Sequence, residues 1–124
     1  MLASIVALVM ATPLSVLNVH TLIPTAEAAQ LTKSDLVAIA TSTAERYGLT
    51  KKQTKIFLDV VSCESGWDVE ATGKLGERGL VQIYPKYHPA ITKEEMLDPY
   101  FSLDFLAKNL FKHPSWWTCF SLVS

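Results

Sequence analysis

The segment from Thr50 to Gly66 constrains the fold more than any other part of the sequence. Thr50 and Gln53 have the spacing of a capping box, in which each side chain accepts a hydrogen bond from the other residue's backbone N–H, so a helix should begin at Lys51. Gly66 is the residue type that most often follows a helix, because glycine adopts the left-handed conformation without steric cost. The sequence therefore predicts a helix over residues 51–65.

A carboxyl group extends the apolar side of this predicted helix. The apolar stripe begins with Phe57, Val60 and Val61, at positions i, i+3 and i+4. Glu64 follows at i+7. Partial burial and the negative end of the helix dipole both favour the protonated form, so we expect a raised pKa for Glu64. A glutamate in a last helical turn is more often a solvated residue or an ion-pair partner, and the spacing alone favours that interpretation. The residues that follow Gly66 favour a general acid instead.

The first 28 residues have the composition of a secretory signal. Residues 2–11 form an almost uninterrupted apolar run, too short for a permanent membrane anchor, and Ala26-Glu27-Ala28 has the Ala-x-Ala pattern of a cleavage site. No Lys or Arg precedes the run, so either the natural start lies upstream or the signal is atypical, and an uncleaved anchor is the lesser alternative. We expect export with cleavage, then one domain over residues 29–124 that could be cut short at Ser124.

The charges of the expected mature chain are balanced. The sequence has 11 Lys and Arg against 12 Asp and Glu, and loss of Glu27 with the signal leaves 11 of each. Since no basic stripe is present, we expect no nucleic-acid partner. His88 and His113 each precede a proline, and with two cysteines they lack the spacing of metal ligands. We expect no metal site.

The two cysteines, Cys63 and Cys119, predict a disulfide. An even pair in a small exported domain is typical of such a bridge, whereas two buried free thiols are the alternative. The bridge would tie the last turn of the chain to the residue next to Glu64, and in the chain-entropy model it would contribute about 3–4 kcal/mol.

Another helix is predicted before this segment. Its N-cap is Thr32 or Ser34, and Gly48 ends it. The side of this helix that we expect to be buried consists of Leu36, Val37, Ala40, Ala44 and Tyr47.

Two more helices are predicted towards the C-terminus. Thr92 and Glu95 form a capping box for a short helix. Asp98-Pro99 opens an amphipathic helix, which His113-Pro114 ends. The apolar residues of this last helix are Leu103, Leu106 and Leu110, with Phe105 nearby.

Two apolar segments have less regular patterns. Gly79–Tyr84 could form a small strand or the floor of a cleft. Trp116, Trp117 and Phe120 are most simply parts of the core, although one of them could line a groove by stacking. These patterns together predict an α+β fold that is predominantly α.

The centre of the chain resembles a known family of domains. Cys63-Glu64-Ser65-Gly66-Trp67-Asp68, followed by Ala71, Gly76 and Gly79-Leu80-Val81-Gln82-Ile83, is similar to the lysozyme-like domain of soluble lytic transglycosylases. In that family a Glu-Ser pair precedes a Gly-Leu-Met-Gln-Ile segment at the same spacing. The similarity continues through Asp98-Pro99 and covers residues 35–110. It implies a small helical lysozyme-like domain with a minimal β element beside the cleft.

The resemblance also implies an activity and a site. Glu64 would protonate the β-1,4 glycosidic oxygen between N-acetylmuramic acid and N-acetylglucosamine, and would then act as base toward the muramyl C6 hydroxyl. The partners would be glycan strands of peptidoglycan, and the protein would be a secreted, periplasmic or cell-wall-associated monomer without a cofactor. The residues expected to bind substrate are Ser65, Gly79, Leu80, Val81, Gln82, Ile83 and Asn109.

Departures from the family pattern keep two alternatives open. Asp68-Val69 replaces an Asn-Pro pair, Gly73 replaces a serine and Asn109 replaces a tyrosine, while the later Ala-Tyr-Asn segment is not recognisable. Asp68 or Glu70 as a second carboxylate would favour hydrolysis, as in a muramidase. The other alternative is a glycan-binding module that has lost turnover.

Overall fold

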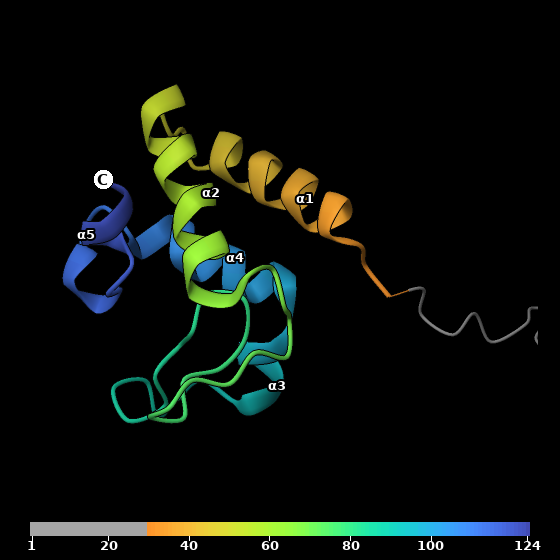
Figure 1. Ribbon diagram of the computed structural model, residues 1–124, viewed down its shortest axis with the longest axis vertical. Helices are drawn as coiled ribbons and strands as arrows, with labels where there is room; N and C mark the ends of the chain where they lie inside the picture. Colours follow the sequence, from red (N-terminus) through yellow and green to blue (C-terminus); the bar gives the residue numbers. More distant parts are fainter. Residues whose placement is uncertain (1–29) are drawn as a thin grey trace, which may run out of the picture. The chain divides into compact units, whose positions relative to one another are not determined.

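The computed structural model describes residues 30–124 of the chain. The expected signal, residues 1–28, lies outside the described residues. Leu31–Ser124 forms one unit, in which α1 packs against α2 and α4, α3 packs against α4, and α5 packs against α2. The elements, in chain order, are α1 (Lys33–Arg46), α2 (Lys51–Ser65), α3 (Lys93–Leu97), α4 (Pro99–Asn109), the 3₁₀ turn η2 (Pro114–Trp116) and α5 (Phe120–Val123) (Figure 1).

The helix starts follow from short-range capping. Thr32, Thr50 and Thr92 are each the N-cap of a complete capping box, which opens α1, α2 and α3. Asp98 accepts hydrogen bonds from two backbone N–H groups of the first turn of α4. Gly66 ends α2 in the left-handed conformation, with φ 60°. The predicted capping residues are therefore confirmed.

The end of α4 differs from the prediction. The helix ends at Asn109, four residues before His113. Beyond it the chain forms a turn, in which the carbonyl of Asn109 accepts the N–H groups of both Lys112 and His113. His113 then has φ −134°, as expected for a residue before proline, which is kept out of the helical region by a steric clash.

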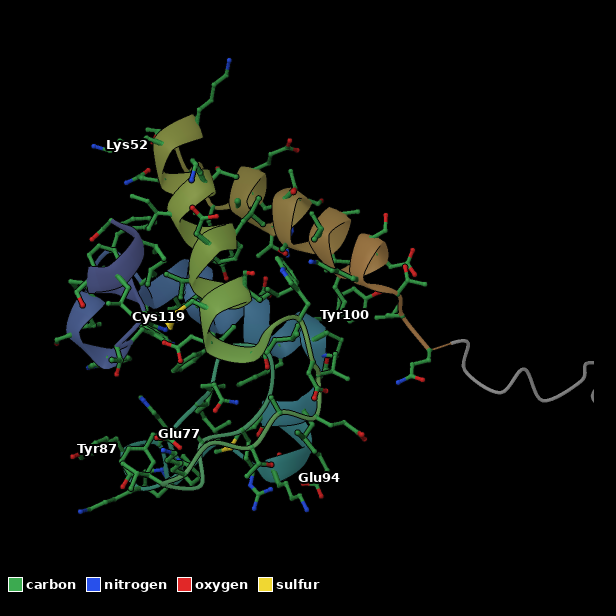
Figure 2. The ribbon with its side chains drawn as sticks, in the orientation of Figure 1. Lys52, Glu77, Tyr87, Glu94, Tyr100 and Cys119 are labelled. Carbon is green, nitrogen blue, oxygen red and sulfur yellow. A yellow bond between two sulfur atoms is a disulfide. The ribbon has the colours of Figure 1, made fainter. Side chains whose placement is uncertain are left out.

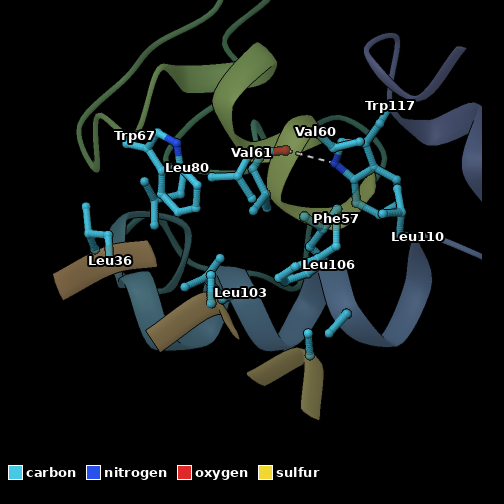
Figure 3. Packing of buried hydrophobic residues seen from close by; sticks show 14 of the residues in the cluster. Leu36, Phe57, Val60, Val61, Trp67, Leu80, Leu103, Leu106, Leu110 and Trp117 are labelled. Carbon is cyan, nitrogen blue, oxygen red and sulfur yellow. Dashed lines mark hydrogen bonds between the residues drawn. The ribbon is translucent and has the colours of Figure 1, made fainter. Parts of the chain in front are cut away.

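The core is a single cluster between α1, α2, α4 and the loop that follows α2 (Figure 3). The predicted stripes of α2 and α4 are confirmed, because their apolar residues are fully buried. The fully or almost fully buried side chains are Leu36, Ala40, Ala44, Phe57, Val60, Val61, Leu80, Val81, Ile83, Met96, Leu103, Leu106, Leu110 and Trp117.

Two aromatic residues expected in the core lie at the surface. Tyr47 is 40% exposed, because it stands at the C-cap of α1, where the chain leaves the helix. Thr43 occupies the buried side of α1 instead and bonds its hydroxyl to the carbonyl of Ile39 at 2.8 Å. Trp116 is 47% exposed, whereas its neighbour Trp117 is buried. The prediction of a core position was wrong for Tyr47 and Trp116.

The structure is predominantly helical, and residues 30–124 contain no strand. Isolated antiparallel bridges join Arg78 to Thr72 and to Ile83. Gly79 and Gln82 both have positive φ, at 79° and 52°, so the apolar run between Arg78 and Ile83 forms a tight turn and cannot extend. The strand considered for this run does not form. The β structure of residues 30–124 consists of the two isolated bridges.

A disulfide joins α2 to the C-terminal segment. Cys63 and Cys119 are bonded, with their Cα atoms 5.9 Å apart. This pairing confirms the prediction. In the described region no helix is long and apolar enough to cross a membrane.

Candidate functional site

Glu64 lies in the last turn of α2, two residues before the left-handed Gly66. Its side chain is partly buried, as its place on the apolar stripe predicted. Its Oε1 accepts a hydrogen bond from the backbone N–H of Cys119 at 3.2 Å. Figure 2 shows Cys119 beside the C-terminal end of α2.

The carboxyl of Glu64 opens into a groove of about 620 Å³. Three segments that are far apart in the sequence build this groove: the end of α2, the loops over residues 73–87, and the chain around η2. Figure 2 labels Glu77 and Tyr87 on those loops. The lining residues are Glu64, Gly73, Lys74, Leu75, Glu77, Gln82, Tyr84, Tyr87, Trp116, Trp117 and Thr118.

Three effects act on the ionisation of Glu64. Burial is the largest and raises the pKa of the carboxyl, because the charged form loses water. The N–H of Cys119 opposes it by stabilising the carboxylate, and the negative charge of Glu77 raises the pKa further. The balance is a raised pKa, which is the property that a general acid requires near neutral pH.

Glu77 is a second carboxylate in the groove that the sequence interpretation missed. Its Oε2 accepts the backbone N–H of Leu75 at 3.0 Å. Gly73 leaves space for it, since a Cβ at that position would overlap the Glu77 carboxylate. The available signal was Gly73, which stands where the family that the sequence resembles has a serine.

The carboxylates considered for a second role lie elsewhere. Asp68 and Glu70 are exposed, and Asp68 Oδ1 accepts the backbone N–H of Glu70 at 2.9 Å in a local turn. Neither residue lines the groove.

Gln82 lines the groove and holds its floor together. Its Nε2 donates to the carbonyls of Ala71 and Gly79 at 3.1 and 2.9 Å. A Cβ built on Gly73 would lie 2.7 Å from Gln82 Oε1, so the free acceptor of the amide points towards Gly73. The two donors of Gln82 are thus engaged by the protein, while Oε1 accepts no hydrogen bond from residues 30–124.

The other predicted binding residues of the pentapeptide are mostly buried. Gly79, Leu80 and Val81 lie in the interior, and the carbonyl of Val81 accepts the indole N–H of Trp117 at 2.8 Å, drawn as the dashed line in Figure 3. Ile83 is also buried and lines a smaller neighbouring cavity. These residues support the floor of the groove from beneath.

Ser65 and Asn109 are not among the residues of the groove. The hydroxyl of Ser65 donates to the carbonyl of Val61 and accepts the N–H of Trp67, which closes the end of α2. The amide of Asn109 donates to the carbonyl of Phe105 on its own helix at 2.8 Å. The structure therefore brings Glu64 and Gln82 together, and leaves these two residues in helix-terminal hydrogen bonds.

An aromatic cavity of about 270 Å³ continues the groove. The two share the side chains of Gln82, Tyr84, Tyr87, Trp116 and Trp117. His88 forms the inner end, with ring centroids 5.1 Å from Phe105 and 4.9 Å from Trp116. Burial lowers the pKa of His88, so its neutral form is favoured beside these aromatic rings.

Within residues 30–124 no three His, Cys, Asp or Glu side chains form a group that could hold a metal ion. Comparison of the chain with protein-family models, curated proteins and solved structures gives no match. The chemistry of the groove must therefore be argued from its own residues.

Proposed function

We propose that the protein is an exported enzyme of the lytic transglycosylase type, which cleaves glycan strands of peptidoglycan. Glu64 protonates the β-1,4 glycosidic oxygen between N-acetylmuramic acid and N-acetylglucosamine. The resulting carboxylate then removes the proton of the muramyl C6 hydroxyl, which attacks the anomeric carbon and gives a 1,6-anhydro product. One carboxyl group therefore serves as acid and then as base, and no cofactor takes part.

The observation that carries this proposal is the setting of Glu64. A partly buried carboxyl with a raised pKa opens into a groove of about 620 Å³, and its backbone is fixed by the end of α2. The raised pKa lets this carboxyl keep its proton to higher pH than an ordinary glutamate, and transfer to a glycosidic oxygen requires such a proton in an accessible groove.

The walls of the groove suit a sugar chain. Tyr87 is 70% exposed, so its ring can stack on the apolar face of a sugar ring. Trp116 is 47% exposed and adds apolar surface beside it, although the His113 ring stacks on one of its faces with the ring centroids 4.4 Å apart. Gln82 Oε1 can accept a hydrogen bond from a sugar hydroxyl or an acetamido N–H. An aromatic wall with a few fixed polar groups is typical of a binding site for a small polar ligand.

The proposal is tested with purified peptidoglycan and mass spectrometry of the released fragments. Wild-type protein should release fragments with 1,6-anhydromuramyl ends, and Glu64→Gln should release none while its circular dichroism spectrum is unchanged. Glu70→Gln, which removes an exposed carboxyl outside the groove, is the matched control and should cleave normally. Normal turnover by Glu64→Gln would remove Glu64 from its role, and wild-type binding without cleavage would make the domain a glycan-binding module.

Hydrolysis is the second candidate, and Glu77 favours it. A second carboxylate in the groove is the group that a muramidase uses to orient or activate water. The charge of Glu77 also raises the pKa of Glu64, so the two carboxyl groups interact.

The two candidates give different products. Glu77→Gln should leave anhydro ends unchanged in a transglycosylase, whereas a muramidase should yield reducing ends that decrease by about 10²-fold or more in the variant. Wild-type fragments with reducing ends alone would replace transglycosylation by hydrolysis.

A further inference from the structure

Cys119 makes two bonds to consecutive residues of α2. Its sulfur is bonded to Cys63, and its backbone N–H donates to the carboxyl of Glu64 at 3.2 Å. Among the hydrogen bonds of residues 30–124, this N–H is the one donor to that carboxyl. The covalent bond and the hydrogen bond thus act on adjacent residues.

Apart from the packing of Phe120 and Val123 on the core, the segment that carries Cys119 is joined to the rest of the fold by few bonds. The helix α5 that follows it is four residues long and has no side-chain cap. Trp117 anchors the segment through its indole N–H bond to Val81, whereas Trp116 and Thr118 face the groove. The disulfide holds the segment at Cys63, an exposed residue that directly precedes Glu64.

We propose that Cys119 is a positioning residue for Glu64: its disulfide with Cys63 holds its backbone N–H against the Glu64 carboxylate, and so fixes the orientation and ionisation of that group. The contact is a property of the chain itself, and its consequence for cleavage rests on the function proposed above.

The ionisation of Glu64 depends on the groups around it. Lys74, Glu77, Tyr84 and Tyr87 are the other titratable residues lining the groove, and of these Glu77 raises the pKa of Glu64. The N–H of Cys119 lowers this pKa, whereas burial raises it. Displacement of the Cys119 segment would change both effects, so loss of the disulfide should shift the pKa of Glu64.

The first experiment is a pH titration of the full oxidised chain by amide proton–nitrogen NMR. An amide hydrogen bonded to a carboxylate changes its chemical shift when the carboxyl loses its proton. The Cys119 amide should therefore titrate with the same midpoint as the side-chain carboxyl carbon of Glu64. In Glu64→Gln this titration of the Cys119 amide should disappear. A Cys119 amide that does not follow Glu64 overturns the proposal.

The second experiment removes the disulfide, by dithiothreitol or by the double substitution Cys63→Ser and Cys119→Ser. In both cases the backbone amide at position 119 should stop following Glu64, and the midpoint of Glu64 should shift, while the amide signals of α1 and α2 stay dispersed. Trp116→Ala is the matched control, because it opens the groove wall but keeps the disulfide, so the coupled titration should persist.

Two results of the second experiment count against the proposal. A coupled titration that persists unchanged without the disulfide shows that Trp117 alone holds the segment. Complete unfolding on reduction shows that the bridge holds the whole domain and has no separate role at Glu64.

The consequence for cleavage is measured separately. If the proposed activity is present, reduction should move the high-pH limb of the kcat profile in the same direction as the Glu64 midpoint measured by NMR, because that limb reports loss of the proton from the acid. Absence of cleavage in the wild-type protein would refute the proposed function and leave both NMR results unaffected. A wild-type enzyme whose pH profile ignores reduction would refute the positioning role.

Discussion

The raised pKa of Glu64 should make the stability of the fold depend on pH. Its pKa in the folded protein is raised above the ordinary value of 4.5, so the folded state holds the proton more tightly than the unfolded state. The stability that this protonation contributes is fully present below about pH 4.5 and is lost as the pH rises through the folded pKa.

Glu64→Gln, whose side chain stays neutral, should therefore gain stability relative to wild type as the pH rises from 4.5 to neutrality. Thermal or urea unfolding at a series of pH values measures this difference. Glu70→Gln removes an exposed carboxyl outside the groove and is the control. If the control gives the same profile, the dependence does not come from the burial of Glu64.

Gly79 is fixed by two independent constraints at the floor of the groove. It has φ 79°, and a Cβ on it would overlap the backbone carbonyl oxygen of Met96. Gly76 also has positive φ, at 89°, but nothing lies within 4 Å of a Cβ there. The two positions therefore separate backbone strain from close packing.

Gly76→Ala should lower the free energy of unfolding by about 1–2 kcal/mol, through left-handed strain alone. Gly79→Ala should cost a further amount of about 1–3 kcal/mol, because the Met96 carbonyl and the Ser102 hydroxyl bonded to it must move. Urea unfolding of both variants tests this order. Equal losses would mean that the loop shifts freely away from Met96.

At the scale of helices, the starts of the helices could be predicted from the sequence, whereas their ends could be predicted only in part. A capping box joins residues three apart, so a helix start can be predicted from a few neighbouring residues. This holds for the starts at Thr32, Thr50 and Thr92. The end of α4 depends on the turn after Asn109, whose carbonyl accepts the N–H groups of Lys112 and His113, and no residue type marks this turn. Tyr47 shows the same limit, since its exposure follows from where α1 stops.

The loop between α2 and α3 was beyond local prediction for a different reason. An apolar run of the composition of residues 79–84 is compatible with a strand, and the choice is made by contacts outside the run. Gly79 packs against the carbonyl of Met96, and Gln82 bonds the carbonyl of Ala71. These partners impose the positive φ angles that turn the run into the floor of the groove.

At the scale of the whole molecule, the groove joins segments that no sequence pattern connects. Periodicity placed Glu64 on the buried side of its own helix, and the cysteine count predicted the bridge to Cys119. The positions of Glu77 and Trp116 opposite Glu64 depend on how the loops fold back over α2, which is a long-range property. The partly buried carboxyl of Glu64 was thus predictable from the sequence, whereas the second carboxylate and the aromatic wall of the groove were not.

The same disulfide should also set much of the stability of the domain. It closes a loop between residues 56 apart, and a cross-link of this length removes unfolded-state entropy equivalent to about 4 kcal/mol at 25 °C in the chain-entropy model. A loss of that size should lower the Tm of a domain of about 100 residues by roughly 15–30 °C.

The double variant Cys63→Ala and Cys119→Ala, and the reduced wild type, should both show this loss in calorimetry or urea unfolding. Agreement between the two assigns the loss to the cross-link, because alanine and a free thiol fill the site differently while the loop is open in both. Cys63 is exposed, so its truncation leaves no cavity on that side of the bridge. A decrease in the free energy of unfolding below about 1 kcal/mol would mean that residual structure already restrains the unfolded chain. The bridge would then act mainly in the folded state, on the contact between Cys119 and Glu64.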